Sequence, residues 1–109
     1  MNISDARVHI AGLVNQTDAI IECREAQGAG DWAMTAFSRY RLLELLGFVQ
    51  TPSYTGECGN DPVVLLEAAA NAVDRLAVPA EQLDWRLSLA EALQRALADV
   101  RMVSGACDV

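Results

Sequence analysis

The sequence predicts an all-α protein: a single-domain antiparallel four-helix bundle, or an irregular four-helix cluster, with one long loop at about residues 47–61. Three observations lead to this prediction. Apolar residues recur at three- and four-residue spacing in four segments, and no segment shows the period of two that is typical of a half-buried strand. Glycine and proline fall between these segments. The length of 109 residues is that of one domain, so residues 1–109 are expected to form a single acidic helical domain.

The first helix is expected over about residues 5–26. Ser4 is a favourable N-cap residue, and Asp5 in the first turn complements the helix dipole. Gly28 and Gly30 are expected to end the helix. An apolar stripe follows one side of this segment: Ile3, Ile10, Leu13, Val14, Thr17, Ile20 and Ile21.

The second helix is expected over about residues 32–46, with Asp31 as its cap. Ala33, Phe37 and Tyr40 lie on one side of it, and Ala36 and Leu43 lie beside them. Other apolar residues extend around nearly the whole circumference of this helix. That pattern predicts either a central helix surrounded by the other three or a surface that pairs with a partner.

A long connection follows the second helix. Gly47 is placed to close that helix in a left-handed conformation. Residues 47–61 then follow neither the helical nor the strand period, and they include Pro52, Gly56, Gly59 and Asn60. A connection of this length is uncommon in a small domain and often has a function.

The third helix is expected over about residues 62–77. Asp61 is a capping residue, and Pro62 suits the first helical position. Pro79 disfavours helical geometry in the residue before it, which predicts the end of this element. Its core stripe consists of Leu65 or Leu66, Ala69, Val73 and Leu76.

The fourth helix is expected over about residues 80–103, with an irregularity near Asp84. One apolar row predicts its buried side and a second row flanks the first. The first row is Leu89, Leu93, Ala96, Val100 and Val103, and the second is Leu83, Leu87, Ala90 and Leu97. Glu91 and Arg95 stand four residues apart in the order that favours an ion pair.

The charge is strongly acidic. Eight basic residues, all of them arginine, against 15 acidic residues give a net charge of −7. Nucleic-acid affinity depends on neutralising phosphates, so neither direct nucleic-acid binding nor docking on an anionic membrane is expected. A net negative charge favours a partner protein that has a basic surface, and the alternative is that the charge only maintains solubility.

The cysteines form an odd set without a CxxC pair: Cys23, Cys58 and Cys107. We therefore expect reduced thiols and a cytoplasmic location. The start of the chain lacks the basic and apolar pattern of a signal peptide.

No constellation for catalysis or metal binding is found in the sequence. His9 is the single histidine and is expected to be solvated, and the spacings typical of zinc, calcium and di-iron sites do not occur. Cys58 with His9 is a weak candidate for a nucleophile and base. We therefore expect no enzyme activity, no catalytic residue, no metal and no cofactor.

Two regions are candidate partner-binding sites. Asp18, Glu22 and Glu25 lie on one side of the first helix and form an acidic ridge, which is either a recognition stripe or an ordinary solvated face. Tyr54 and Glu57 lie in the long loop, and tyrosine is enriched in binding hot spots.

These observations favour a small acidic helical protein that binds and modulates a larger protein. A narrower hypothesis is an inhibitor of nucleic-acid-handling machinery, of the kind that phages and mobile elements encode, such as an anti-CRISPR protein. It depends on similarity of character, without a shared motif. The alternative from a different class is a homodimeric structural or assembly module without catalytic activity. A third alternative is a small-molecule pocket lined by Tyr40, Tyr54 or Cys58.

Overall fold

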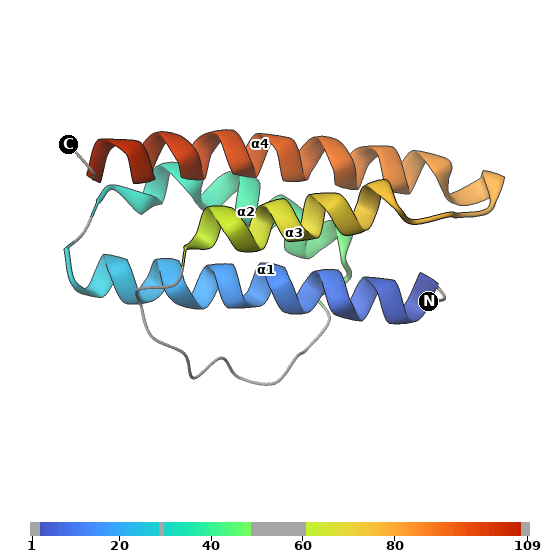
Figure 1. Cartoon of the computed structure of the whole chain (residues 1–109), viewed down its shortest axis with the longest axis horizontal. Helices are drawn as coiled ribbons and strands as arrows, with labels where there is room; N and C mark the ends of the chain where they lie inside the picture. Colours follow the sequence, from blue (N-terminus) through green and yellow to red (C-terminus); the bar gives the residue numbers. More distant parts are fainter. Residues whose placement is uncertain (1–2, 29, 49–60, 108–109) are drawn as a thin grey trace.

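The computed structural model describes residues 3–28, 30–48 and 61–107, which form four α-helices (Figure 1). These are α1 (Ile3–Ala26), α2 (Ala36–Leu45), α3 (Pro62–Asp74) and α4 (Leu83–Cys107). Short 3-10 turns precede two of them, η1 (Trp32–Thr35) before α2 and η2 (Ala80–Gln82) before α4. The described residues contain no strand, so the predicted all-α four-helix class is confirmed.

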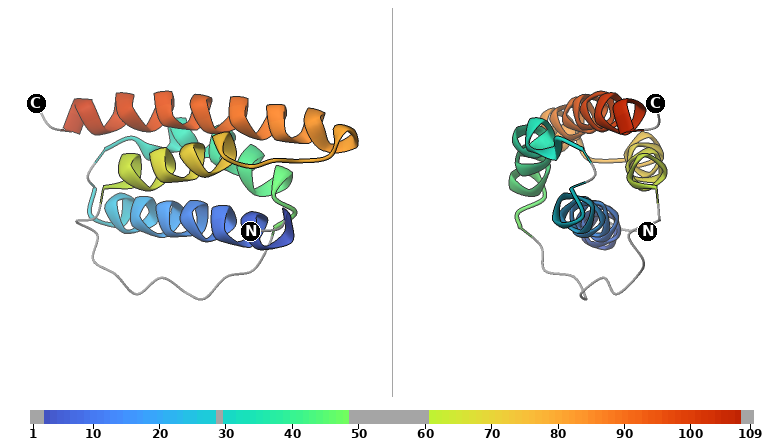
Figure 2. Two further views of the ribbon diagram at one scale, coloured as in Figure 1. Left: turned by 45° about the vertical axis from the view of Figure 1, so that its right-hand side comes forward. Right: turned by 90° about the vertical axis from the view of Figure 1, so that its left-hand side faces the viewer.

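The order of the helices around the bundle explains the long connection. Figure 2 shows α2 and α3 on opposite sides of the molecule, with α1 and α4 between them. Both α2 and α3 run antiparallel to α1 and to α4, so they share one direction (Figure 1). The end of α2 and the start of α3 therefore lie at opposite ends of the bundle, and a tight turn cannot join them. A two-residue turn would have forced α3 to run in the opposite direction.

The core lies where the helices meet, and α1 against α3, α3 against α4 and α2 against α4 are the main contacts. The apolar row predicted for the fourth helix is buried throughout, and the predicted stripes of α1 and α3 are buried over most of their length. Trp32 is also fully buried. The largest fully buried side chains are Trp32, Ile10, Ile20, Ile21, Leu42, Leu46, Leu66, Leu89, Leu93, Val14, Val73 and Val100.

Three residues were predicted to cap the N-termini of helices, and one of them does so in the structure. Asp61 caps α3 as expected, because its Oδ1 accepts a hydrogen bond from the Val63 N–H at 2.9 Å. Asp31 makes no side-chain capping bond, and its ψ of 76° departs from the extended backbone that directs a capping carboxylate. Ser4 lies inside α1 because the helix begins one residue earlier, at the half-buried Ile3.

The predicted glycine at the end of α2 is confirmed in detail. Gly47 has a φ of +75°, and its N–H donates to the carbonyl of Glu44 at 3.1 Å. The N–H of Phe48 donates to the carbonyl of Leu43 at 2.9 Å, which completes a Schellman motif. Gly28 likewise has a positive φ of 72° at the end of α1.

The expectation of reduced cysteines is wrong for Cys23, which is bonded in a disulfide. Its partner lies outside the residues whose side chains the structure describes. The sequence could not reveal this pairing because widely spaced cysteines say nothing of which thiols meet. In the described part of the chain, no helix combines the length and apolar character that crossing a membrane requires.

Candidate partner-binding surface

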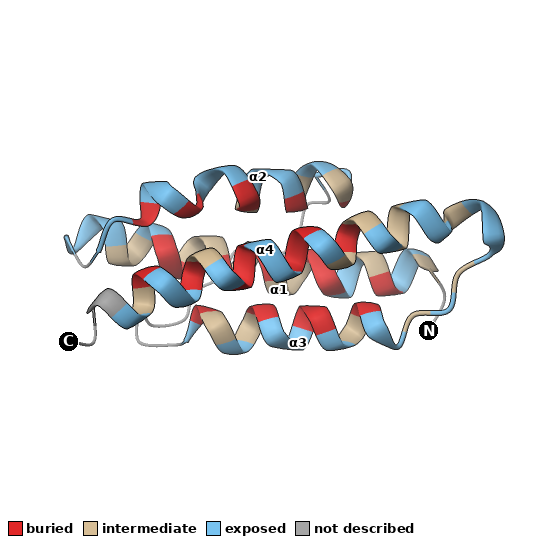
Figure 3. Cartoon of the chain, turned by 90° about the horizontal axis from the view of Figure 1, so that it is seen from above, coloured by how far each residue is buried: buried red, intermediate tan, exposed pale blue. Residues whose placement is uncertain are grey.

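The helix α2, together with η1, has its polar and apolar sides reversed relative to the prediction. The side chains of Thr35 and Ser38 are buried against the rest of the bundle, whereas Phe37 is 91% exposed. Figure 3 shows that the exposed side of α2 is turned away from α4. We define the α2 face as its exposed large apolar residues: Met34, Phe37, Tyr40 and Phe48.

The prediction of a central helix surrounded by the other three is therefore wrong. Ala33, Phe37 and Tyr40 are exposed, and the buried side of this segment consists of Trp32, Thr35, Ser38, Leu42 and Leu46. The sequence pattern favoured burial because apolar residues extend around nearly the whole circumference of the segment. Here hydrogen bonding and ion pairing take the place of apolar packing over one turn of the helix.

The buried hydroxyl groups are hydrogen-bonded. The Thr35 hydroxyl donates to the carbonyl of Trp32 at 2.7 Å and accepts from the Arg39 Nε at 2.8 Å. The Ser38 Oγ lies 3.1 Å from the carbonyl of Thr35 and 2.9 Å from the Asp99 Oδ2 on α4. Turning α2 to bury Phe37 would separate the Ser38 hydroxyl from Asp99, and a buried polar group that is left unsatisfied costs about 1–3 kcal/mol. The other bonds lie within the same segment and would turn with it.

An ion-pair cluster between α1 and α2 fixes the other side of the helix. The Arg39 guanidinium lies 3.1 Å from the Asp18 Oδ1 and 3.6 Å from the Glu25 Oε1. The side chains of Arg39 and Asp18 are only 12% and 17% exposed. This cluster supplies a specific contact where α1 and α2 otherwise touch sparsely.

The cluster changes the interpretation of the predicted acidic ridge. Two of its three carboxylates, Asp18 and Glu25, pair with an arginine of the same chain. Glu22 is exposed. The ridge is therefore partly an internal contact between helices, and whether it binds a partner stays a prediction. Tyr54 and Glu57, the other predicted partner-binding residues, lie outside the described residues.

Burial raises the pKa of the Asp18 carboxyl above its ordinary value of 3.8. The hydrogen bond from Arg39 and the charge of Arg39 act in the opposite direction, and the charge of Glu22 adds to the increase. Desolvation is thus the dominant effect on this group.

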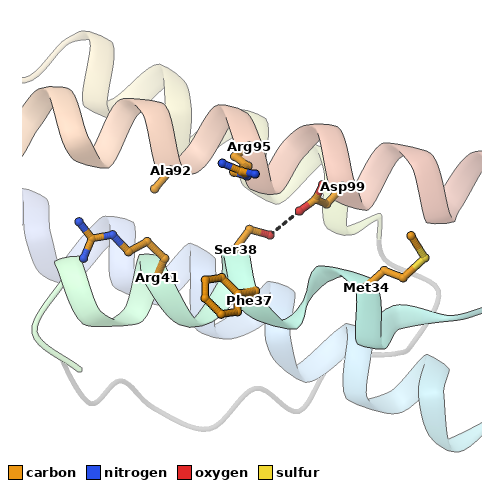
Figure 4. A pocket seen from close by; sticks show the side chains of 7 residues that line it. All are labelled: Met34, Phe37, Ser38, Arg41, Ala92, Arg95 and Asp99. Carbon is orange, nitrogen blue, oxygen red and sulfur yellow. Dashed lines mark hydrogen bonds between the residues drawn. The ribbon is translucent and has the colours of Figure 1, made fainter.

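A groove runs beside the α2 face, between α2 and α4. We define the α2–α4 groove by its lining residues, which enclose about 560 Å³: Met34, Phe37, Ser38, Arg41, Ala92, Arg95 and Asp99. In Figure 4, Ser38 and Asp99 are joined across it, with Arg95 on the α4 side and Arg41 on the α2 side. The groove is therefore apolar along α2 and carries polar groups on both walls.

An aromatic pair extends the exposed surface beyond the groove. The rings of Tyr40 and Phe48 lie 5.6 Å apart between centroids, at an interplanar angle of 59°. Phe48 has a φ of 53°, which is rare for a residue with a bulky side chain. The Schellman closure and the ring contact hold Phe48 beside Tyr40, with both side chains exposed.

The sequence did not single out Phe37 and Met34 as exposed residues, although a partner surface on the second helix was one of its two alternatives. The sequence contains a signal for this orientation: Thr35, Ser38 and Leu42 follow helical spacing on the side opposite the aromatic residues. Two hydroxyl side chains on one side of a helix indicate that this side either faces solvent or is buried with its hydroxyl groups hydrogen-bonded. Only the position of Asp99, 61 residues away, decides between them.

A second, smaller cavity lies between α1 and α3. It encloses about 390 Å³ and is lined by Ala6, His9, Ala72, Arg75, Leu76 and Ala77. His9 is exposed, as the sequence predicts. Among the described residues, no three His, Cys, Asp or Glu side chains come together in an arrangement that could hold a metal ion.

Comparisons of this chain with models of known protein families, with curated proteins and with solved structures find no match. The site is therefore interpreted from its own geometry.

Proposed function

We propose that this protein is a non-catalytic binding protein that recognises a larger protein through the α2 face and the α2–α4 groove. The observation that supports this function is the orientation of α2. This helix buries Thr35, Ser38 and Arg39 in polar contacts and leaves Phe37 almost fully exposed. Exposed apolar patches of this kind mark interaction sites, and aromatic residues are enriched in binding hot spots.

The α2 face is a better candidate surface than the acidic ridge. An aromatic side chain that leaves water on binding contributes favourable free energy without first breaking a contact of the free protein. Asp18, in contrast, would have to give up its ion pair with Arg39 before it could pair with a partner. The net charge of −7 still supports attraction of a basic surface elsewhere on the partner at long range.

A capture experiment with matched variants tests the proposed function. Tagged wild type, Phe37→Ser and Val64→Ser are used to capture proteins from source cells. Val64 is the control because it is an exposed apolar residue on α3, away from α2. We expect Phe37→Ser to lose the stoichiometric partner, Val64→Ser to retain it, and both variants to keep the wild-type melting temperature. Equal capture by both variants would exclude the α2 face as the binding surface.

The same samples test the alternative of a homodimeric assembly module. Light scattering of the purified wild type reports a dimer if two copies pair through the α2 face, and Phe37→Ser would then be monomeric. The identity of a captured partner tests the narrower hypothesis of an inhibitor of nucleic-acid-handling machinery.

A cytoplasmic location is part of the proposal, and the disulfide of Cys23 is the observation against it, because disulfides are rare in reducing compartments. Alkylation of thiols in intact cells before lysis separates the two cases. A Cys23 that is alkylated supports the cytoplasm, and a protected Cys23 supports an oxidising compartment.

A further inference from the structure

The charges that line the α2–α4 groove differ from the charge of the whole protein. Arg41 and Arg95 supply two cations, and Asp99 supplies one anion that already accepts a hydrogen bond from Ser38. Arg41 forms an ion pair with Glu44, and both side chains are about half exposed. When Glu44, the partner of Arg41, is included, the groove carries as many anions as cations, in a chain whose net charge is −7.

Of the two cations that line the groove, Arg95 is the one without a partner in the part of the chain that the structure describes. Its exposed side chain forms no hydrogen bond or ion pair with any described residue, and the expected pair with Glu91 is not formed. A guanidinium offers several donors in a planar fork that fits a carboxylate with two parallel bonds. A carboxylate that binds beside Phe37 would complete this arrangement.

The length of the groove suits a short helical segment. Along η1 and α2, its lining residues extend from Met34 to Arg41, which is eight residues or about 10 Å from first to last. A partner helix presents about two turns over this distance, with apolar anchors at i, i+3 or i+4. Met34 and Phe37 would contact those anchors.

We propose that the occupant of the α2–α4 groove is an amphipathic helical segment of another protein that carries carboxylates beside its apolar anchors. This inference rests on the proposed function and specifies the chemistry of the partner. Arg95 binds the partner's carboxylate, and Phe37 packs against its apolar side.

The net charge of the protein does not prevent this binding. Repulsion between the acidic protein and an acidic segment is screened beyond about 8 Å at physiological ionic strength. Contact with Arg95 acts at a few ångströms, where screening is weaker.

A peptide-display selection tests the inference without knowledge of the natural partner. A library of random peptides of about 12 residues, roughly three helical turns, is selected on the wild type and counter-selected on Phe37→Ser. Enriched peptides are synthesised, and their affinities are measured for the wild type, Arg95→Gln and Arg75→Gln. Arg75 is the matched control, because it is an exposed arginine on the other side of the molecule whose side chain has no ion pair among the described residues.

We expect the enriched peptides to combine apolar residues at helical spacing with Asp or Glu. Arg95→Gln should weaken their binding about tenfold or more, and Arg75→Gln should leave it within about twofold. Enriched peptides that lack carboxylates, or that bind Arg95→Gln as tightly as the wild type, would overturn the inference while leaving the α2 face as a binding surface. Selection that yields no peptide sensitive to Phe37→Ser would overturn both the inference and the proposed function.

Discussion

Six of the eight arginine side chains contact other groups of the same chain. Arg39 pairs with two carboxylates of α1, and the Nε and Nη2 of Arg86 donate to the carbonyls of Leu76 and Asp74, which ties α4 to the end of α3. Arg7 and Arg24 lie over the rings of Trp85 and Trp32, with 4.9 Å and 5.7 Å to the ring centroids. Arg41 and Arg101 form surface ion pairs with Glu44 and Glu67. The planar guanidinium suits bidentate and stacked contacts of this kind, which an ammonium group makes less well.

The raised pKa of Asp18 predicts a specific dependence of stability on pH. Because the carboxyl binds its proton more tightly in the folded state than in the unfolded state, the folded state holds more protons between pH 3.8 and the raised pKa. The contribution of Asp18 to the free energy of unfolding therefore decreases as the pH rises through this window. Arg39 lies against this carboxyl, and Glu22 and Glu25 are the other acidic residues near it.

Chemical denaturation of the wild type and Asp18→Asn between about pH 3 and pH 7 measures this contribution. We expect the free energy of unfolding of the wild type, relative to that of Asp18→Asn, to fall as the pH rises. A difference that grows with pH would show that the ion pair with Arg39 outweighs burial and that the pKa is lowered instead.

At the scale of single elements, the end of α2 depends on one glycine. Gly47 has a φ of +75°, and a Cβ at this position would meet no atom within 4 Å. Gly47→Ala should therefore destabilise the protein by about 1–2 kcal/mol through backbone conformation alone. Gly12→Ala is the matched control: it lies inside α1 with equally open space and should stabilise the protein by about 0.5–1 kcal/mol. Thermal unfolding of both variants checks the prediction, and a stabilised Gly47→Ala would contradict it.

The two aspartates that precede helical segments give a second matched pair. Asp61→Ala removes the hydrogen bond to the Val63 N–H and should cost about 1 kcal/mol of stability. Asp31→Ala removes no capping bond and should change the stability by less than about 0.5 kcal/mol. Urea denaturation of both variants measures the difference. Equal losses would mean that Asp31 caps η1 in solution.

Periodicity was sufficient to predict all four helices and the buried sides of three of them. The apolar stripes of α1 and α3 and the first apolar row of α4 face the core, whereas Leu83 and Leu87 of its second row are about half exposed. The buried side of the second helix could not be predicted in this way, because Ser38 and Arg39 face inward toward Asp99 and Asp18. Contacts between residues that are 21 or 61 positions apart leave no local signal in a single sequence. For the same reason, the sequence did not decide between a central helix and a partner surface.

At the scale of the whole molecule, the topology leaves α2 at the edge of the structure. Its main contact is with α4, its contact with α1 is sparser, and its third side faces solvent (Figure 2). Polar contacts therefore hold α2 against α4 and α1, and its aromatic residues lie on the side that faces solvent. A peripheral helix of this kind can accept a partner without rearrangement of the core, which fits the small backbone movements of many pre-organised interfaces.

The most direct test of the partner-binding surface is site-specific photo-crosslinking in source cells. A photoreactive phenylalanine analogue replaces Phe37 in one sample and Val64 in another, since both positions are exposed and apolar. We predict a covalent one-to-one adduct with a single larger protein from position 37 and none from position 64. Adducts of equal yield from both positions, or none from position 37, would contradict the conclusion that the α2 face binds a partner.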